Sequence, residues 1–409
     1  MHTDCIILGG GASGLSACAS LQKAGMRVTL VERQSRVGKK LLSTGNGRCN
    51  LSNVLMEPSL YGEAAPFVSR VYARTPPDEV MAFFSVLGLM TACEEGRVYP
   101  RTHMAASVLD VLRAGCEGAE ILTGCPVEAI TPSRRGGWSV SLADGRGLFA
   151  PVVLACMGGS AAPHLGTDGA GARLLDALGH TVTPQLPALV QLRCSHPALR
   201  SLKGIRVQAA LSLLVDGQAA AREEGELLFA DYGVSGVCVF QLSRHAARAL
   251  DAGRRVSLHV HLLPEVPEGT LPGWLDARIA ALPGRDAQAL FTGVLPRLLT
   301  QAVLRQAGIV QDAPADRLTP VARHALAQAV CAFPLEVTGT QGFANAQVTA
   351  GGVALDEVDP DTMASRLLDC LYLAGELLDV DGPCGGYNLH FAFASGLTAA
   401  KAIRARLAG

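Results

Sequence analysis

Apolar runs alternate with small and polar residues at the start of the chain. Residues 4–8 read DCIIL, a segment rich in small residues follows, and a second apolar run, RVTLVE, covers residues 27–32. Short apolar runs that enclose a helical stretch are typical of parallel strands joined by a crossover helix. The small-residue segment stops at Gly25, and glycine commonly ends helices. The pattern therefore predicts a βαβ unit over residues 4–32.

This alternation continues to about residue 192, with glycine-rich turns between the segments. LFAPVVLACMGGSA (148–161) reads as one buried strand that ends in glycines, and LYLAGE (371–376) reads as a second. From about 190 the pattern changes to β segments, IRVQAALSLLVDG and RRVSLHVHLLP, and then to a helical stretch from Leu271 to about Val330. Alternating strands and helices predict an α/β fold with a doubly wound sheet, and the change of pattern predicts an insertion.

The predicted insertion divides the chain into three stretches. Residues 1–188 form the first part of a nucleotide-binding domain, and residues 189–345 form an inserted domain with a helical subdomain at about 270–330. Residues 346–409 return to the first domain with a last strand and a long helix, Tyr387 to about Leu407. The sequence contains no internal repeat or low-complexity linker, so we expect the parts to be closely packed.

A glycine fingerprint lies between the first two predicted strands. Gly9, Gly11 and Gly14 form G-x-G-x-x-G, and Glu32 ends the second strand. In such a unit the first glycine permits a tight turn, the second lets backbone approach a pyrophosphate, and the third allows helix and strand to pack closely. The acid can accept hydrogen bonds from a ribose and disfavours a 2′-phosphate. We therefore expect FAD or NAD to bind here, on Gly9, Gly11, Ala12, Ser13, Gly14, Glu32 and Arg33.

Two late features favour FAD over NAD. The strand LYLAGE ends in Gly375 and Glu376, where flavoproteins of the glutathione-reductase type bring backbone and an acid against the ribityl-phosphate arm. Gly385 and Gly386 then precede the last helix, whose N-terminus is expected to face the flavin pyrimidine and to stabilise negative charge on the reduced ring. An ordinary glycine turn before a C-terminal helix is the alternative that the residues leave open.

The segment STGNGRCNLSN (43–53) is polar, compact and poor in large aliphatic side chains. Its composition alone fits a solvated loop. It follows the ribose-binding strand closely, however, and a flat ring with polar edges needs N–H donors at close range and little side-chain bulk. We therefore interpret the segment as a flavin-binding loop in extended conformation. Cys49 has no CxxC partner and is expected to pack rather than to react.

Composition and charge exclude several other classes of protein. The chain has 409 residues, of which 49% are hydrophobic, and 35 basic against 36 acidic side chains, so it carries no basic field for nucleic acid. No apolar run is long enough to span a membrane, and the N-terminus enters a strand without a leader, which favours a cytoplasmic location. The 12 cysteines form no CxxC motif, which argues against zinc or iron–sulfur binding, and we expect no metal site.

Five longer blocks carry a family resemblance. The chain resembles the BaiN-type (YhiN-like) family of bacterial FAD-dependent oxidoreductases. The resemblance implies a Rossmann-like FAD-binding domain of the glutathione-reductase type, interrupted by an inserted substrate domain made of a β-barrel and a helical piece. It also implies non-covalent FAD. The blocks are VGKKLLSTGNGRCNLSN (37–53), GRVYPRTHMAASVLDVL (96–112), GELLFADYGVSGVCVFQLSR (225–244), FPLEVTGTQGFANAQVTAGGV (333–353) and LYLAGELLDVDGPCGGYNLHFAFASG (371–396).

The catalytic assignment comprises His390, Tyr387 and Arg48. His390 is chosen as a titratable side chain on the first turn of the last helix, where we expect it to titrate near neutrality and to deliver a proton to a reduced carbon. A histidine that only packs at the helix N-terminus is the alternative that the residues leave open. Asp231, Val237 and His390 depart from the family pattern, which leaves the substrate open. Besides the fingerprint residues, the cofactor-binding assignment comprises Lys40, Thr44, Gly45, Asn46, Gly47, Arg48, Val127, Cys156, Met157, Gly158, Gly375, Glu376, Gly386, Tyr387, Asn388 and Leu389, with Asn50 also lining the loop.

Weaker candidates remain beside this site. His259 and His261 share one face of a predicted strand, as metal ligands can, but no third ligand is evident, which favours a structural role. Arg97, Tyr99 and Arg101 are candidates for an anion-binding or proton-donating group near the flavin, or form only a packed loop.

The family resemblance implies hydride transfer through flavin N5, with NAD(P)H-dependent reduction of a conjugated carbon–carbon double bond in a small organic substrate. Only one dinucleotide fingerprint is present, so NADH or NADPH would bind transiently. Oxidation of a small amine by oxygen is the alternative enzymatic reading. A non-catalytic flavin-binding protein or an RNA-modification partner is a third, which the near-neutral charge disfavours. The oligomeric state stays open.

Overall fold

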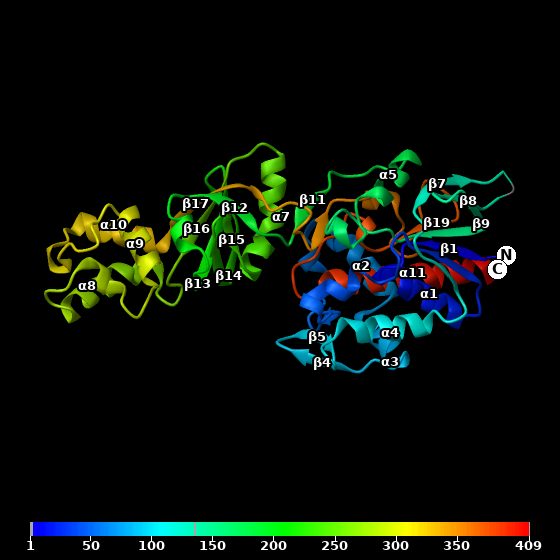
Figure 1. The fold of residues 1–409 in the computed structure, drawn as a ribbon, viewed down its shortest axis with the longest axis horizontal. Helices are drawn as coiled ribbons and strands as arrows, with labels where there is room; N and C mark the ends of the chain where they lie inside the picture. The colour runs from blue at the N-terminus through cyan, green and yellow to red at the C-terminus, as the bar shows by residue number, and fades with distance from the viewer. Residues whose placement is uncertain (1–2, 135, 409) are drawn as a thin grey trace. The chain divides into compact units, whose positions relative to one another are not determined.

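The computed structural model describes residues 3–134 and 136–408, and its chain divides into two compact units (Figure 1). The sheet unit comprises the chain up to Leu186 and again from Gln347, and the barrel unit comprises Pro187–Ala346. Each unit has its own hydrophobic core. The short strands β11 (Leu186–Ala188) and β18 (Val348–Ala350) lie where the chain leaves the sheet unit and where it returns.

A five-stranded parallel sheet forms the centre of the sheet unit. All four residues of β1 are buried, and β1 pairs in register with β2 on one side and with β10 on the other. Strands buried on both faces read as continuous apolar runs, which explains the sequence pattern. The predicted βαβ unit is confirmed. The order is β19 (Leu371–Leu373), β10 (Val152–Ala155), β1 (Cys5–Leu8), β2 (Val28–Val31) and β6 (Glu120–Leu122), with helix α1 (Ala12–Lys23) between β1 and β2.

Two small antiparallel sheets complete the strands of this unit. The expectation of one strand over 148–161 is wrong, because two strands from different sheets meet there. Pro151, which has no N–H to donate, separates them. The strand before it, β9, alternates between exposed and buried residues, whereas β10 is fully buried. The sheets are β7 (Val127–Pro132), β8 (Trp138–Leu142) and β9 (Gly147–Ala150), and β3 (Ser52–Asn53), β5 (Arg97–Pro100) and β4 (Thr91–Glu94).

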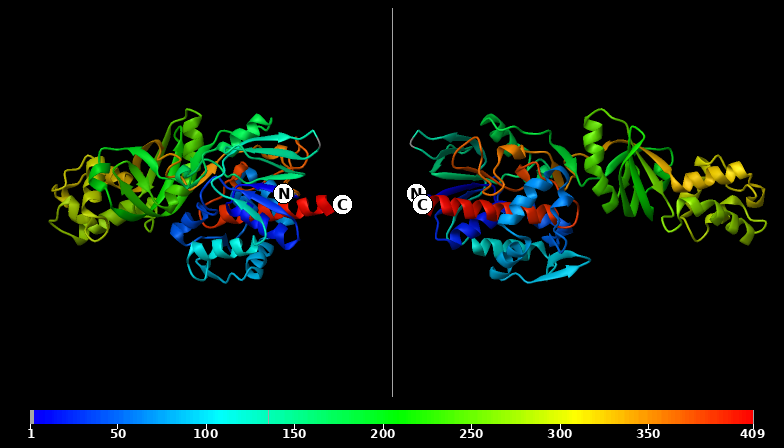
Figure 2. Two further views of the ribbon diagram at one scale, coloured as in Figure 1. Left: turned by 45° about the vertical axis from the view of Figure 1, so that its right-hand side comes forward. Right: turned by 180° about the vertical axis from the view of Figure 1, so that it is seen from behind.

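The C-terminal helix α11 (Tyr387–Ala408) packs closely on α1. A Cβ added at Gly396 would lie 2.4 Å from the backbone oxygen of Ser13, so only glycine permits this approach. Figure 2 shows α11 beside the N-terminal strands. The sheet unit also contains α2 (Ala65–Arg74), α3 (Pro77–Val86), α4 (Ala105–Gly115) and α5 (Ala170–Ala177).

The barrel unit combines a closed six-stranded barrel with helices. Apolar residues of the strands and of the last three helices, such as Leu211, Leu275 and Val330, belong to one core. The fold class predicted for the insertion, a β-barrel with a helical part, is confirmed. The strand order is β12 (Leu192–Ser195), β15 (Gly233–Ser235), β14 (Gln218–Ala230), β13 (Arg206–Val215), β16 (Val256–His261) and β17 (Phe333–Thr340), and the helices are α6 (Leu199–Leu202), α7 (Val237–Asp251), α8 (Leu271–Ala281), α9 (Arg297–Gln306) and α10 (Pro320–Cys331).

Candidate functional site

The glycines of the turn between β1 and α1 have different surroundings. Gly9 has a φ of +106°, and a Cβ there would lie 2.4 Å from the backbone oxygen of Cys156. A Cβ at Gly14 would lie 2.0 Å from the backbone oxygen of Gly9. At Gly11, chain neighbours aside, no described atom lies within 4 Å of the added carbon. Gly9 and Gly14 therefore serve internal packing, whereas Gly11 leaves open space where a pyrophosphate can approach the backbone.

Glu32 is held at the end of β2 by backbone donors. Its Oε2 accepts a hydrogen bond from the Gly10 N–H at 2.9 Å, and its Oε1 accepts one from the Gln34 N–H at 2.7 Å. A carboxylate offers about four acceptor sites, so lone pairs remain for ribose hydroxyls. The neighbouring Arg33 forms an ion pair with Asp168 at 2.6 Å. The carboxylate is thus oriented before any ligand arrives.

The end of β19 meets the start of α1. Gly375 has a φ of +76°, and a Cβ there would lie 2.5 Å from Ser13 Oγ. The next residue, Glu376, accepts a hydrogen bond from the Thr349 N–H at 2.8 Å and pairs with Lys40 Nζ at 2.6 Å. Glu376, the acid after β19, is therefore ion-paired with Lys40, which lies 336 residues earlier in the chain.

The first part of the segment 43–53 is not extended, contrary to the expectation from its sequence, whereas Ser52 and Asn53 at its end form strand β3. The segment starts within two 3-10 turns, η1 (Leu41–Gly47), and Gly45, Asn46 and Cys49 have φ values of 55–56°. The Cys49 N–H donates to the backbone oxygen of Thr44 at 3.0 Å. Glycine and asparagine tolerate the left-handed region best, which explains why the sequence uses them here. The resulting loop is compact and presents backbone groups with few bulky side chains.

This loop contacts the N-terminus of α11. Ser52 Oγ lies 2.9 Å from His390 Nδ1, and Asn53 Nδ2 donates to the backbone oxygen of Gly385 at 3.0 Å. Gly386 has a φ of +99°, and a Cβ there would lie 2.3 Å from the backbone oxygen of Ser52. The two glycines before the helix therefore permit a direct contact between segments that the sequence separates widely.

His390 does not have the environment that the sequence suggested. Its side chain is fully buried, and its ring packs edge-on against Tyr72 at 5.5 Å between centroids. This burial lowers the pKa of His390 to about 4. The expected titration near neutrality is therefore wrong, and His390 is a neutral side chain at neutral pH.

Arg48 belongs to a cluster with the β4–β5 hairpin. Its Nη2 pairs with Glu94 Oε2 at 2.6 Å and donates to His103 Nδ1 at 2.7 Å. The guanidinium carbon lies 4.3 Å from the centroid of the Tyr99 ring. The hydrogen bond from Arg48 lowers the pKa of Glu94. Tyr99 came from the predicted group of Arg97, Tyr99 and Arg101, whereas Glu94 and His103 were missed because nothing local marks them as partners of Arg48.

The first turn of α11 contains Tyr387, Asn388 and Leu389. The ring of Tyr387 packs edge-on against Tyr61, and burial raises the pKa of Tyr387. Asn388 closes the preceding turn, because its Oδ1 accepts from the Gly382 N–H at 2.8 Å and its Nδ2 donates to the Gly382 oxygen at 2.9 Å. Leu389 is half-buried. The turn is thus fixed by its own side chains.

The remaining assigned residues lie at the ends of two other strands. Cys156, Met157 and Gly158 follow β10, and the Cys156 N–H donates to the backbone oxygen of Leu8 at 2.7 Å. Burial raises the pKa of Cys156 to about 12. Val127 begins β7 and is half-buried. All the assigned residues lie in the sheet unit, and their individual roles stay predictions.

Of the two histidines of β16, His261 is held by backbone groups. His261 is buried, and its Nδ1 accepts a hydrogen bond from the Leu263 N–H at 3.3 Å while its Nε2 lies 3.1 Å from the Val266 oxygen. Over residues 3–134 and 136–408, no group of three or more His, Cys, Asp or Glu is arranged to hold a metal ion. None of the helices in these ranges is both long and apolar enough to cross a membrane.

The residues of the site fit a flavin dinucleotide. The open space at Gly11 and the carboxylate of Glu32 suit the pyrophosphate and ribose, and the glycine-rich loop and the N-terminus of α11 supply backbone donors for the ring edge. Within the described chain, Asn50 Oδ1 and His390 Nε2 are buried without a hydrogen-bond partner. Such atoms are rare in a complete structure and are expected where a ligand belongs.

The parallel sheet, the glycine turn and the acid after β2 define the class of protein, a dinucleotide-binding protein built on a Rossmann-type sheet. The fold is similar to that of the open conformation of a flavocytochrome c3 fumarate reductase, with a TM-score of 0.50 at 15% identity, covering 99% of this chain and 78% of that chain.

The chain matches the HI0933-like protein Rossmann domain over residues 3–402 and belongs to that family. It is 40% identical over 405 residues to a 3-dehydro-bile acid delta(4,6)-reductase of Clostridium scindens, with 98% of each chain covered. It is 29% identical over 403 residues to a ribosomal RNA dihydrouridine synthase of Escherichia coli, with 97% of each covered. The BaiN-type resemblance is confirmed, and the protein is an FAD-dependent oxidoreductase.

Proposed function

We propose that the protein reduces a carbon–carbon double bond conjugated to a carbonyl group in a small alicyclic substrate. The observation that carries this proposal is the 40% identity, over 98% of both chains, to a reductase of a 3-dehydro-bile acid. A 3-oxo group conjugated to double bonds at positions 4 and 6 is such a system. Dihydrouridine also arises when a carbon–carbon double bond next to a carbonyl is saturated. The reaction named for the more distant relatives is therefore of the same type.

Bound FAD would supply the hydride, and the chain supplies orientation and electrostatics. The N-terminus of α11 places backbone N–H groups and the positive end of the helix dipole at the loop 43–53, where they would stabilise negative charge on the ring. Tyr387 fits the proton donor better than His390 does. Burial keeps the phenol of Tyr387 protonated at neutral pH, whereas His390 has lost its extra proton well below it.

A nicotinamide is the proposed reductant, bound only transiently. The chain contains one G-x-G-x-x-G fingerprint, and the FAD dinucleotide would occupy it. NADH or NADPH would therefore deliver its hydride to the flavin and leave before the organic substrate enters. An oxidase of small amines would need no such step.

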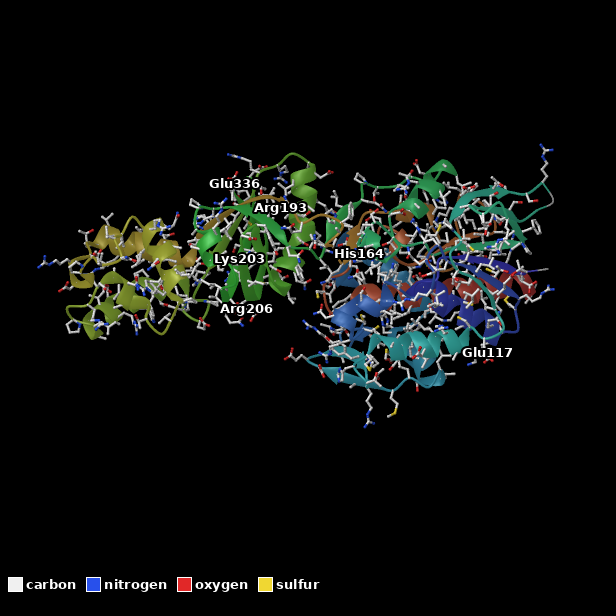
Figure 3. The ribbon with its side chains drawn as sticks, viewed as in Figure 1. Glu117, His164, Arg193, Lys203, Arg206 and Glu336 are labelled. Carbon is white, nitrogen blue, oxygen red and sulfur yellow. The ribbon has the colours of Figure 1, made fainter. Side chains whose placement is uncertain are left out.

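Three exposed cations of the barrel unit are paired with carboxylates, which argues for a small molecule over RNA. Lys203 pairs with Asp231 at 2.7 Å, and Arg206, labelled with Lys203 in Figure 3, pairs with Glu226. Arg254 pairs with Asp216 at 2.8 Å. A cation that neutralises a phosphate releases a counterion from the nucleic acid, and a cation that already has a carboxylate partner must give up that partner first. These three cations are therefore less available to an RNA backbone than unpaired cations would be.

Anaerobic reduction of the holoprotein tests the proposal. We expect NADH or NADPH to bleach the flavin absorption band, and a 3-oxo-4,6-diene steroid to restore it with formation of a product in which one of the two double bonds is saturated. The control is a steroid with an isolated double bond and no adjacent carbonyl, which should leave the flavin reduced. Reoxidation by a uridine-containing RNA hairpin but not by the steroid would contradict the small-molecule substrate. Reduction of the flavin by a primary amine alone would favour the oxidase.

A further inference from the structure

A donor and an acceptor lie side by side where the loop 43–53 meets α11. The acceptor is Asn50 Oδ1, which is buried and has no hydrogen-bond partner among the described residues. It would lie 2.9 Å from a Cβ added at Gly386, so it is adjacent to the first residues of the helix. The donors are the first N–H groups of α11, which have no partner within the helix itself. A ligand edge with alternating acceptor and donor atoms matches this pair.

The oxidised isoalloxazine ring has such an edge, with carbonyl oxygens at O2 and O4 and a single N–H, at N3, between them. A buried carbonyl oxygen without a donor is costly, and N3–H is the one N–H donor that the oxidised ring can offer. We infer that Asn50 Oδ1 accepts the hydrogen bond of flavin N3–H, while the N-terminus of α11 donates to O2. Asn50 is thus the residue that fixes the rotation of the ring in its plane.

The surrounding contacts hold Asn50 in place for this role. A Cβ at Gly45 would lie 3.0 Å from the Asn50 nitrogen, and Gly386 could not carry a side chain without meeting both Ser52 O and Asn50 Oδ1. Loop and helix therefore approach each other as closely as their backbones allow. His390 Nε2, also unpartnered, lies one helical turn further on, and its neighbour Ser52 binds its other ring nitrogen. Of these two atoms, Asn50 Oδ1 is therefore the acceptor that lies beside the N-terminus of α11.

The test pairs a change in the protein with a matched change in the ligand. Apoprotein is titrated with FAD and with 3-methyl-FAD, in which a methyl group replaces the N3 hydrogen, and flavin fluorescence reports the dissociation constant. We expect N3-methylation to weaken binding to the unchanged protein about tenfold or more, because the bond is lost and the acceptor stays buried. In Asn50→Ala the same methylation should change binding less than threefold, because its acceptor is already gone.

Two further variants control this experiment. Asn50→Asp keeps the shape and an acceptor, so it should retain the preference for FAD over 3-methyl-FAD while its negative charge lowers the reduction potential of the bound flavin. Asn345→Ala, an exposed asparagine of the barrel unit, should behave as the unchanged protein does. If methylation weakens binding by the same factor in the unchanged protein and in Asn50→Ala, both folded by circular dichroism, Asn50 does not face N3 and the inference is wrong.

The inference concerns the cofactor and not the substrate. Because binding is measured without turnover, the inference about Asn50 can be wrong while the proposed reduction of a conjugated double bond is right. The inference can equally be right while the proposed reaction is wrong. Loss of all discrimination in Asn50→Asp would also overturn the inference about Asn50, since the carboxylate still offers an acceptor at that position.

Discussion

Gly11 and Gly14 lie three residues apart in one turn, yet they are glycines for different reasons. The Cβ of a substituted Gly11 enters open space, and its φ of −88° suits any residue, whereas at Gly14 the Cβ would overlap the oxygen of Gly9. We expect Gly11→Val to keep the unfolding free energy within about 1 kcal/mol of the unchanged apoprotein and to lose FAD binding. Gly14→Ala should destabilise the apoprotein by about 2–3 kcal/mol.

Denaturant unfolding of the apoproteins and FAD titration separate the two outcomes. Equal losses of stability in both variants would mean that Gly11 also serves internal packing, and full FAD affinity in Gly11→Val would place the pyrophosphate elsewhere.

The burial of His390 makes stability depend on pH. The unfolded chain takes up the imidazole proton near pH 6.5, and the folded protein does so only at about 4. Between these values the unfolded state binds more protons, so stability falls as the pH falls from about 6.5 to about 4, by roughly 3 kcal/mol in total. In His390→Gln the free energy of unfolding should change less between pH 6.5 and pH 4, because the titrating group is gone. The measurement is urea unfolding at saturating FAD from pH 4.5 to 7, and parallel curves for the two proteins would contradict the assignment.

Cys49 is a packing residue within the loop 43–53. It is fully buried, and this burial raises the pKa of its thiol to about 12, so almost no thiolate exists at neutral pH. We expect Cys49→Ser to cost about 1–3 kcal/mol of stability, because a hydroxyl is buried, and to leave reductive turnover within a few-fold. The assay measures turnover per bound FAD. Complete loss of turnover with a normal flavin spectrum would instead make the thiol part of the chemistry.

At the scale of elements, a buried histidine connects two parts of the sheet unit. His180 follows α5, and its ring contacts Glu357 and Ser365, two residues that precede β19. His180 Nδ1 donates to Glu357 Oε2 at 2.9 Å, and its Nε2 lies 2.9 Å from Ser365 Oγ. The order Ser–His–Glu is that of hydrolytic triads, but Ser365 Oγ also accepts hydrogen bonds from the N–H groups of Leu367 and Leu368. These bonds occupy the lone pairs that a nucleophile would need, so the three side chains connect loops.

Replacement of this histidine tests that role. His180→Phe removes both hydrogen bonds of a buried side chain, while its half-buried partners Glu357 and Ser365 keep their other bonds, so it should lower the unfolding free energy by about 1–3 kcal/mol. Ser365→Ala loses the bond to His180 and the two bonds from the N–H groups of Leu367 and Leu368, but water can reach this half-buried position, so it should cost only about 1 kcal/mol. Denaturant unfolding measures both. A larger effect of Ser365→Ala than of His180→Phe would show that the histidine is not the centre of the connection.

At the scale of the whole molecule, two units with separate cores predict two unfolding transitions. All assigned FAD-binding residues lie in the sheet unit, so cofactor should stabilise that unit alone. With free FAD at about 100 times its dissociation constant, the gain is about 2.7 kcal/mol, or roughly 5–10 °C in the midpoint of one transition. Calorimetry with and without FAD measures this shift.

Matched variants assign the two transitions. Glu32→Ala should abolish the shift with FAD and leave the second transition in place, whereas Leu211→Ala, in the barrel core, should lower only the transition that FAD does not move. A single transition that moves as a whole would mean that the two units unfold together.

The local pattern of residues determined the first βαβ unit, the glycine fingerprint, the long last helix and the change from sheet unit to insertion. Each of these depends on residues close together in the chain, because hydrophobic period and turn chemistry are local properties. The same reasoning missed the break at Pro151, since two apolar strands joined by one residue read as a single run.

Only the tertiary structure decided which distant side chains meet. Lys40 pairs with Glu376 across 336 residues, Arg48 meets Glu94, and His390 is buried against Ser52 and Tyr72. The sequence contains the residues of these pairs but not their distances, because packing around one core selects the partner of each side chain. The pKa of His390 shows the consequence: its type predicts titration near neutrality, and its burial, which no local pattern specifies, moves it to about 4.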